Sequence, residues 1–198
     1  VVVSHFGRRY EINARHGVVL GAGGFEWNQE LRDKFFKVPG LTRYSSTPED
    51  ANRGETLVAG MKVGAATEHT AYGWYMPTMH MPMPKASNFE EIHQAAFDVG
   101  RPHSVCVNRN GVRFVDEACG YDEFGKGMVR DHLKTGANCP CWLVFDATFR
   151  AKFTAGGFMP SLIMPDFVIP IDWWDHYIFK SDTVEGLAAK IGVPVDAL

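Results

Sequence analysis

The first part of the chain has the hydrophobic pattern of β-strands. Val1–His5 is rich in strand formers, Tyr10–Ala14 alternates apolar and polar residues, and Gly17–Leu20 is a continuous apolar run, as in a buried strand. A glycine turn ends that run, and Asn28 then caps a helix predicted over Gln29–Phe36. The order predicts a unit of strand, glycine turn and helix.

The middle of the chain changes from helical to irregular character. A polar loop over Thr42–Asn52 precedes a predicted helix at Glu55–Val63, which has apolar residues at helical spacing and stops at Gly64. Residues 72–87 are rich in aromatic residues, Met and Pro. Such a segment is typical of a cleft lining or of a crossing between domains.

The second half of the chain predicts a mixed order of helices and strands. Strands at Ser104–Asn108 and Val112–Val115 flank Asn110-Gly111, which is a strong hairpin signal. The other predicted elements are helices at Phe89–Phe97, at 122–133 and at Val184–Ile191, and a strand at Trp142–Phe145. Without internal repeats, this order predicts the α+β class with antiparallel strands.

Composition favours a small-molecule partner. The chain has 198 residues, 45% of them hydrophobic, which is enough to bury a core. The net charge is -3, from 20 Lys+Arg and 23 Asp+Glu, without a basic block. Attraction for nucleic acid or an anionic membrane is therefore weak. No apolar run approaches the roughly 20 residues of a spanning helix, so no stable membrane insertion is expected.

The cysteines indicate the cellular compartment, and the first residues indicate that the chain is a fragment. Cys106, Cys119, Cys139 and Cys141 contain no CxxC pair and are predicted to be free thiols in a reducing, cytoplasmic compartment. Val1 opens directly on a strand pattern with no Met before it. This start predicts an internal piece of a longer protein.

The glycine turn comprises Gly21, Ala22, Gly23 and Gly24. Without a Cβ, its backbone can approach another group closely. It is not the dinucleotide fingerprint, because Glu26 occupies the place of the third glycine. Taken alone, the motif favours a tight structural turn.

A second cluster combines four methionines with one histidine. Met76, Met79, His80, Met81 and Met83 contain ligand types that hold Cu(I). Methionine also fills irregular apolar surfaces, and the neighbouring prolines and aromatic residues favour that interpretation. No metal site is predicted.

Tyr121 stands directly before the predicted helix that begins at Asp122. The backbone amides at a helix N-terminus favour a deprotonated phenol there. A loop tyrosine is more often a packing or capping residue.

No Gly-x-Ser-x-Gly elbow or P-loop is present, so hydrolase and NTPase functions lose support.

Several ordered motifs together carry a family resemblance. They are residues 14–28, Gly54-Glu55-Thr56, Gly64-Ala65-Ala66, Val107–Glu117, Cys141–Asp146 and Asp182–Pro194. This set resembles the fumarate reductase and 3-ketosteroid dehydrogenase superfamily of flavoproteins, over nearly the whole chain and more specifically than any single motif.

The resemblance implies FAD as the cofactor of the intact parent protein. Residues 1–75 are then the remnant of an FAD-binding domain, and 76–198 are a substrate or capping domain, truncated at its C-terminal end. Since the chain contains no G-x-G-x-x-G segment, we expect it not to retain FAD by itself. The implied cofactor-binding residues are Gly21, Ala22, Gly23, Gly24, Phe25, Gly54 and Glu55, the last in place of the family's usual Asp.

Two positions separate the branches of this superfamily. Fumarate reductases have a His-Pro-Thr motif and a proton-donating Arg, where this chain has Met76-Pro77-Thr78 and Tyr121. Methionine cannot pair with a carboxylate, and tyrosine is not a fixed cation, so reduction of a dicarboxylate is not expected. The resemblance is therefore to the 3-ketosteroid dehydrogenases, in which the tyrosine removes a proton beside the ketone, although Gly120 replaces their common Pro.

The implied activity is FAD-dependent dehydrogenation of an apolar, steroid-like cyclic ketone, with Tyr121 as the base. One alternative is a fumarate reductase-like or other enone-reducing flavoprotein. Another is that the isolated chain is an inactive substrate-domain module. The candidate residues of the substrate pocket are Trp74, Tyr75, Met76, Arg101 and Phe124.

Overall fold

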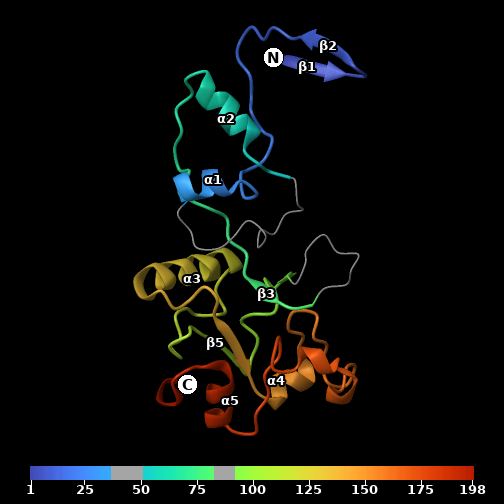
Figure 1. The fold of residues 1–198 in the computed structure, drawn as a ribbon, viewed down its shortest axis with the longest axis vertical. Helices are drawn as coiled ribbons and strands as arrows, with labels where there is room; N and C mark the ends of the chain where they lie inside the picture. Colours follow the sequence, from blue (N-terminus) through green and yellow to red (C-terminus); the bar gives the residue numbers. More distant parts are fainter. Residues whose placement is uncertain (37–50, 83–91) are drawn as a thin grey trace.

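The computed structural model describes residues 1–36, 51–82 and 92–198. The molecule is elongated, with an N-terminal arm at one end and a larger body that contains the C-terminus at the other (Figure 1). Most of the predicted loop over 42–52, together with Met83 and residues 89–91, lies outside the described residues.

The arm begins with an exposed antiparallel hairpin. Strand β1 (Val2–His5) pairs with β2 (Arg8–Glu11), so the second predicted strand begins and ends earlier than expected. The third predicted strand, Gly17–Leu20, is wrong: these residues form no strand, and Val19 is 97% exposed. A buried strand needs neighbours on both sides, and no described segment pairs with this one.

The helices of the arm follow their local signals. Helix α1 (Gln29–Leu31) starts where predicted, because the Asn28 side chain accepts a hydrogen bond from the Leu31 amide at 3.1 Å. It continues as a π-helix, η1 (Arg32–Phe36). Helix α2 (Glu55–Lys62) confirms the second prediction.

A short antiparallel pair connects the arm to the body. Strand β3 (Thr78–His80) pairs with β4 (Ile92–Gln94). The helix predicted over Phe89–Phe97 is therefore wrong in its described part. The Ala95 amide also donates to the Pro77 carbonyl at 2.9 Å, so pairing with a distant segment overrides the local helix preference.

The central pair of the body is β5 (Ser104–Val107) with β6 (Trp142–Phe145), again antiparallel. The turn predicted at Asn110-Gly111 is confirmed, since the Gly111 amide donates to the Asn108 carbonyl at 2.9 Å. The second arm of the predicted hairpin is wrong. It is reduced to one bridge, Val107 with Arg113, because the Cys106 amide donates to the Glu117 side chain instead of to a strand partner.

Helices surround this pair, and α3 lies across the end of the body that faces the arm (Figure 1). The core includes Phe124 and Phe149, each 1% exposed, and the fold is mixed α+β, as predicted. The remaining elements are α3 (Tyr121–Thr135), α4 (Ala147–Lys152) and α5 (Val184–Ile191), with 3-10 turns at Asp166–Val168, Ile171–Trp173 and Val195–Ala197.

Candidate functional site

The two segments that the sequence associates with the cofactor lie together in the arm. A Cβ on Gly54 would be only 2.8 Å from the Phe25 Cβ and 2.5 Å from the Leu31 Cδ1. The Asn28 side-chain amide also donates to the Arg53 carbonyl at 2.9 Å. The glycine turn and the start of α2 therefore form one unit, and only glycine fits at position 54.

The glycine turn has one covered face and one open face. Asn52 lies directly over Gly23 and donates to the Glu26 carboxylate at 2.6 Å. Around Gly21, by contrast, a Cβ would meet no atom within 4 Å, and both Gly21 and Ala22 are exposed. A flat ligand can therefore approach the backbone at Gly21, so these residues fit one wall of a cofactor site.

A shallow groove of about 440 Å³ runs beside this unit. Sequence reasoning proposed only Glu55 among the lining residues as a cofactor residue; it interpreted Asn28 as a helix cap, and the others carry no motif. The lining consists of Asn28, Arg53, Glu55, Val58, Ala59 and Lys62.

A second group of candidate residues lies at the start of α3. Tyr121 is the first residue of this helix, directly after the extended Gly120. Its ring stacks on the Trp74 ring, with 6.3 Å between the centroids and 10° between the planes. Trp74 is 82% exposed, so the stack borders solvent. The structure thus brings together two predicted site residues that lie far apart in the sequence.

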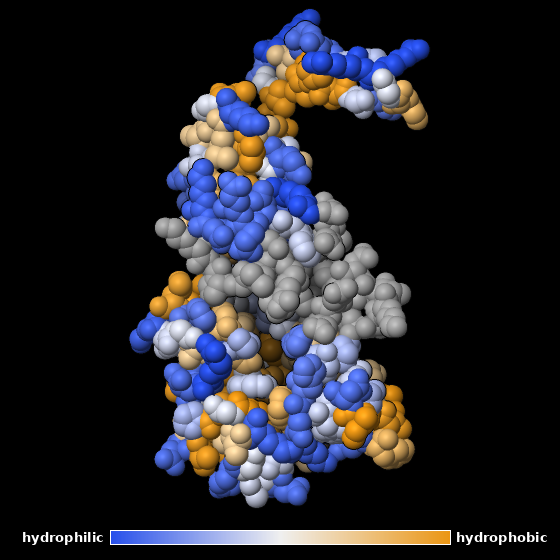
Figure 2. All heavy atoms as spheres, viewed as in Figure 1, coloured by the Kyte–Doolittle hydropathy of each residue, from blue (hydrophilic) through white to orange (hydrophobic). Residues whose placement is uncertain are grey.

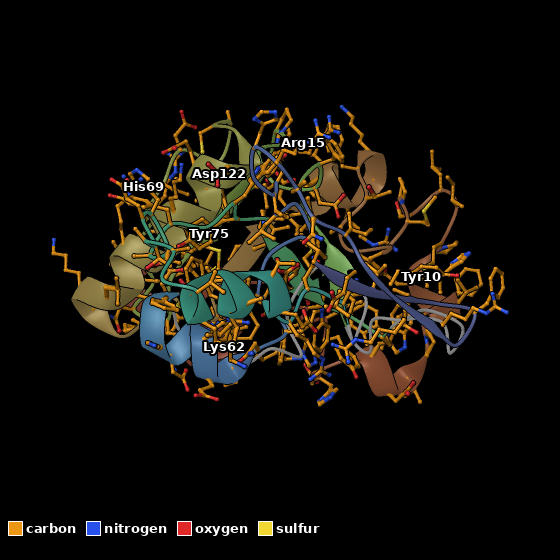
Figure 3. The ribbon with its side chains drawn as sticks, turned by 90° about the horizontal axis from the view of Figure 1, so that it is seen from above. Tyr10, Arg15, Lys62, His69, Tyr75 and Asp122 are labelled. Carbon is orange, nitrogen blue, oxygen red and sulfur yellow. The ribbon has the colours of Figure 1, made fainter. Side chains whose placement is uncertain are left out.

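Tyr75 is held between the arm and α3. Its backbone amide donates to Asp122 Oδ1 at 2.9 Å, and its ring stacks on Phe36 at 5.7 Å. Figure 3 labels Tyr75 and Asp122, which lie near one another beside α3. Burial raises the pKa of the Tyr75 phenol above its ordinary value, and the Asp122 charge adds to this effect. The phenol therefore stays protonated.

The remaining predicted pocket residues occupy different places. Met76 is half-buried next to Tyr75. Phe124 is 1% exposed and packs edge-on against Phe114 in the interior. Arg101 is exposed, and its Nε donates to the Phe97 carbonyl at 3.0 Å. None of these contacts tests a substrate role, so their place in a pocket stays a prediction.

The methionine cluster serves packing in its described part. Met81 is buried with Phe158 and Ile169, and Met79 packs against this cluster. Across the described ranges, no group of three His, Cys, Asp or Glu side chains is arranged to hold a metal ion. The four cysteines are free, and burial raises the pKa of the Cys141 thiol to about 12.

Sequence reasoning missed three residues of α3 that contact the aromatic segment or support it. Asp122 binds the Tyr75 amide, Lys126 pairs with Asp122 at 2.6 Å, and Gly125 lies against Tyr75. An acid four residues before a lysine is a local signal for their ion pair. No local signal identifies Tyr75 as the partner.

Comparisons with known proteins identify the family of this chain. The family model described as FAD binding domain matches residues 1–190. A 3-oxosteroid 1-dehydrogenase of Mycolicibacterium smegmatis is 36% identical over 191 residues, which cover 93% of this chain and 31% of that protein. A 4-oxocyclohexanecarboxylate 2-dehydrogenase of Sinomonas cyclohexanicum is 28% identical, over 94% of this chain and 30% of that protein.

A solved structure is also similar. The 3-ketosteroid Δ1-dehydrogenase from Sterolibacterium denitrificans, crystallised with 1,4-androstadiene-3,17-dione, matches 99% of this chain with a TM-score of 0.83 and 37% identity. The match covers 34% of that structure, so the chain spans about a third of the length of these relatives. Because the family model matches most of its residues, the chain belongs to the FAD binding domain family, as its resemblance to the 3-ketosteroid dehydrogenase flavoproteins predicted.

Proposed function

We propose that this chain is part of an FAD-dependent dehydrogenase that introduces a double bond beside the carbonyl of an apolar cyclic ketone. The stack of Trp74 on Tyr121 at the start of α3 carries the proposal. It places a phenol beside an exposed aromatic surface that suits a flat apolar ring. The relatives named for 3-oxosteroids support a steroid-like substrate.

The reaction divides into a proton step and a hydride step. The carbonyl makes the hydrogen on its neighbouring carbon acidic, and the Tyr121 oxygen takes that proton while the C–H electron pair becomes the new C=C bond. The hydride on the next carbon would leave with its electron pair to FAD, which would supply the acceptor when bound. Tyr121 is the first residue of α3, and its ring lies against the exposed Trp74 ring, where a flat substrate could reach the phenol oxygen.

The proposed cofactor residues belong to the arm. In the turn Gly21–Gly24, Gly21 and Ala22 present the open backbone, and Phe25, Gly54 and Glu55 complete the unit beside the groove along α2. In this proposal residues 1–75 are part of the FAD-binding domain, and 76–198 are part of the substrate domain. In the same proposal, α3 and Trp74 contact the substrate.

Replacing Tyr121 by Phe tests the base. Tyr121→Phe keeps the ring stack but removes the proton acceptor, so kcat should fall by roughly a hundredfold or more while KM and flavin content change little. The measurement is a steady-state assay of the FAD-loaded, full-length protein with a 3-ketosteroid and an artificial electron acceptor. Tyr72→Phe is the matched control, because Tyr72 is 75% exposed and contacts His69 rather than Trp74.

The outcomes separate the parts of the proposal. Normal kcat in Tyr121→Phe would remove the catalytic assignment. Turnover of 4-oxocyclohexanecarboxylate but of no 3-ketosteroid would keep the reaction and replace the substrate class. Reduction of an enone or of fumarate by the wild type, without ketone dehydrogenation, would support the reductase alternative instead.

A further inference from the structure

The segment that contains Trp74 and Tyr75 is fastened to α3 at one polar point. The Tyr75 amide donates to Asp122 Oδ1 at 2.9 Å, which joins residues 47 positions apart in the sequence. The neighbouring Trp74 ring is the one that stacks on Tyr121. Asp122, next to the proposed base Tyr121, therefore holds Tyr75. Tyr75 in turn is next to Trp74, on which Tyr121 stacks.

Both oxygens of the Asp122 carboxylate are engaged. Oδ1 accepts the Tyr75 amide, and Oδ2 lies 2.6 Å from Lys126 Nζ. The hydrogen bond from Lys126 and then the one from the Tyr75 amide hold the pKa of Asp122 below its ordinary value, although burial acts in the opposite direction. Asp122 is thus ionised, and both of its oxygens contact other groups of the protein.

The surface of α3 is shaped to receive this segment. Asp122, Gly125 and Lys126 have the i, i+3, i+4 spacing that places side chains on one helix face. A Cβ on Gly125 would overlap the Tyr75 Cβ and lie 3.2 Å from its Cγ. Tyr75 therefore lies directly on the helix backbone, and Phe36 stacks on its ring at 5.7 Å.

We infer that Asp122 is a positioning residue, which fixes the Trp74–Tyr75 segment on α3 and so sets the orientation of the Tyr121 phenol. This inference rests on the proposed role of Tyr121 as the base. The bond acts through geometry: an unfastened segment leaves the Tyr121 ring without its stacking partner, and small displacements of a reacting group lower rates steeply.

Two substitutions at Asp122 test the inference in the FAD-loaded, full-length protein. Asp122→Ala removes the acceptor, so kcat for a 3-ketosteroid should fall roughly ten- to a hundredfold, and the Tyr75 amide should exchange hydrogen faster. Asp122→Asn retains an oxygen that accepts the same amide, so kcat and exchange should stay within about threefold of wild type. Rescue by Asn is not expected if the negative charge itself is required.

Glu123→Ala is the matched control. Glu123 lies in the same helical turn and also pairs with Lys126, at 3.0 Å, but its carboxylate has no bond to Tyr75. The kcat of the Glu123→Ala variant and the hydrogen exchange rate of its Tyr75 amide should equal those of wild type. If Asp122→Ala behaves like Glu123→Ala, or if Asp122→Asn is as slow as Asp122→Ala, the positioning role is overturned while the proposed reaction stands. A wild type that converts neither a 3-ketosteroid nor 4-oxocyclohexanecarboxylate overturns both.

Discussion

At the scale of single residues, Glu117 shows how a carboxylate can serve the fold next to a proposed site. Its side chain is only 6% exposed and accepts the Cys106 amide at 2.7 Å. Arg113 donates to it through Nη2 at 2.6 Å and Nε at 3.0 Å. Both oxygens are satisfied, so Glu117 joins β5 to the segment that leads to Tyr121.

Glu117→Gln should lower the free energy of unfolding by about 1–3 kcal/mol, because the buried amide cannot satisfy both donors as the carboxylate does. Denaturant unfolding at neutral pH measures the change. Glu123→Gln is the control, since that carboxylate is 56% exposed and should change stability by less than about 0.5 kcal/mol. Equal effects of the two substitutions would contradict the anchoring role.

The same contact predicts a pH dependence. Burial acts to raise the pKa of Glu117, but the hydrogen bonds from Arg113 and the Cys106 amide outweigh it and hold the pKa below its ordinary value. A lowered pKa in the folded state stabilises the protein above the unfolded value of about 4.3, and this contribution is lost as pH falls through the folded value. Unfolding of Glu117→Gln should therefore depend less on pH in that acid range.

At the scale of elements, α3 departs from what helix propensity alone favours. Gly125 and Gly127 lie inside the helix, where Ala is favoured by about 1 kcal/mol for each residue. Their surroundings differ. A Cβ at Gly125 would overlap Tyr75, whereas a Cβ at Gly127 would lie 3.0 Å from one Val115 methyl carbon.

Gly125→Ala should therefore displace the Trp74–Tyr75 segment and lower kcat for the ketone by roughly tenfold or more, despite the gain in helix propensity. Gly127→Ala, with the same propensity gain, should leave kcat near wild type and change the melting temperature little. Steady-state kinetics and thermal unfolding of both variants provide the comparison. A faster or unchanged Gly125→Ala enzyme would show that the contact with Tyr75 is unimportant.

At the scale of the whole molecule, both the arm and the body expose large apolar side chains, among them Val19 in the arm and Leu162 and Phe167 in the body. Hydrophobic atoms are exposed in the arm beside its hairpin (Figure 2), and Val18, Val19 and Leu20 are each more than half exposed. None of the described helices is both long enough and apolar enough to cross a membrane. A cytoplasmic location stays a prediction.

The chain by itself should bind FAD weakly. It offers an open glycine turn and a shallow groove, but its sequence contains no G-x-G-x-x-G loop to bind the pyrophosphate. A fluorescence titration with FAD and the absorption spectrum of the purified chain test this expectation. Flavin at near one equivalent per chain would contradict it, and in that case the chain would form a sufficient site without that loop.

Local signals in the sequence were enough to determine α1, α2, α3, α5 and the family, but they missed α4 and wrongly predicted a helix through Ile92–Gln94. Asn28 and Gly64 act on backbone groups within one helical turn, so the start of α1 and the end of α2 followed from neighbouring residues. The Asn110-Gly111 turn is local in the same sense. The ordered motifs likewise identified the FAD binding domain family before any contact was known.

Only the tertiary structure decided the strand partners and the site geometry. The pairing of β3 with β4 and of β5 with β6, and the absence of a strand at Gly17–Leu20, depend on which distant segment supplies the hydrogen bonds. The Trp74–Tyr121 stack and the bond from Tyr75 to Asp122 also join distant positions. A local pattern reports what a residue prefers among its neighbours, whereas such contacts form only where the folded chain brings two surfaces together.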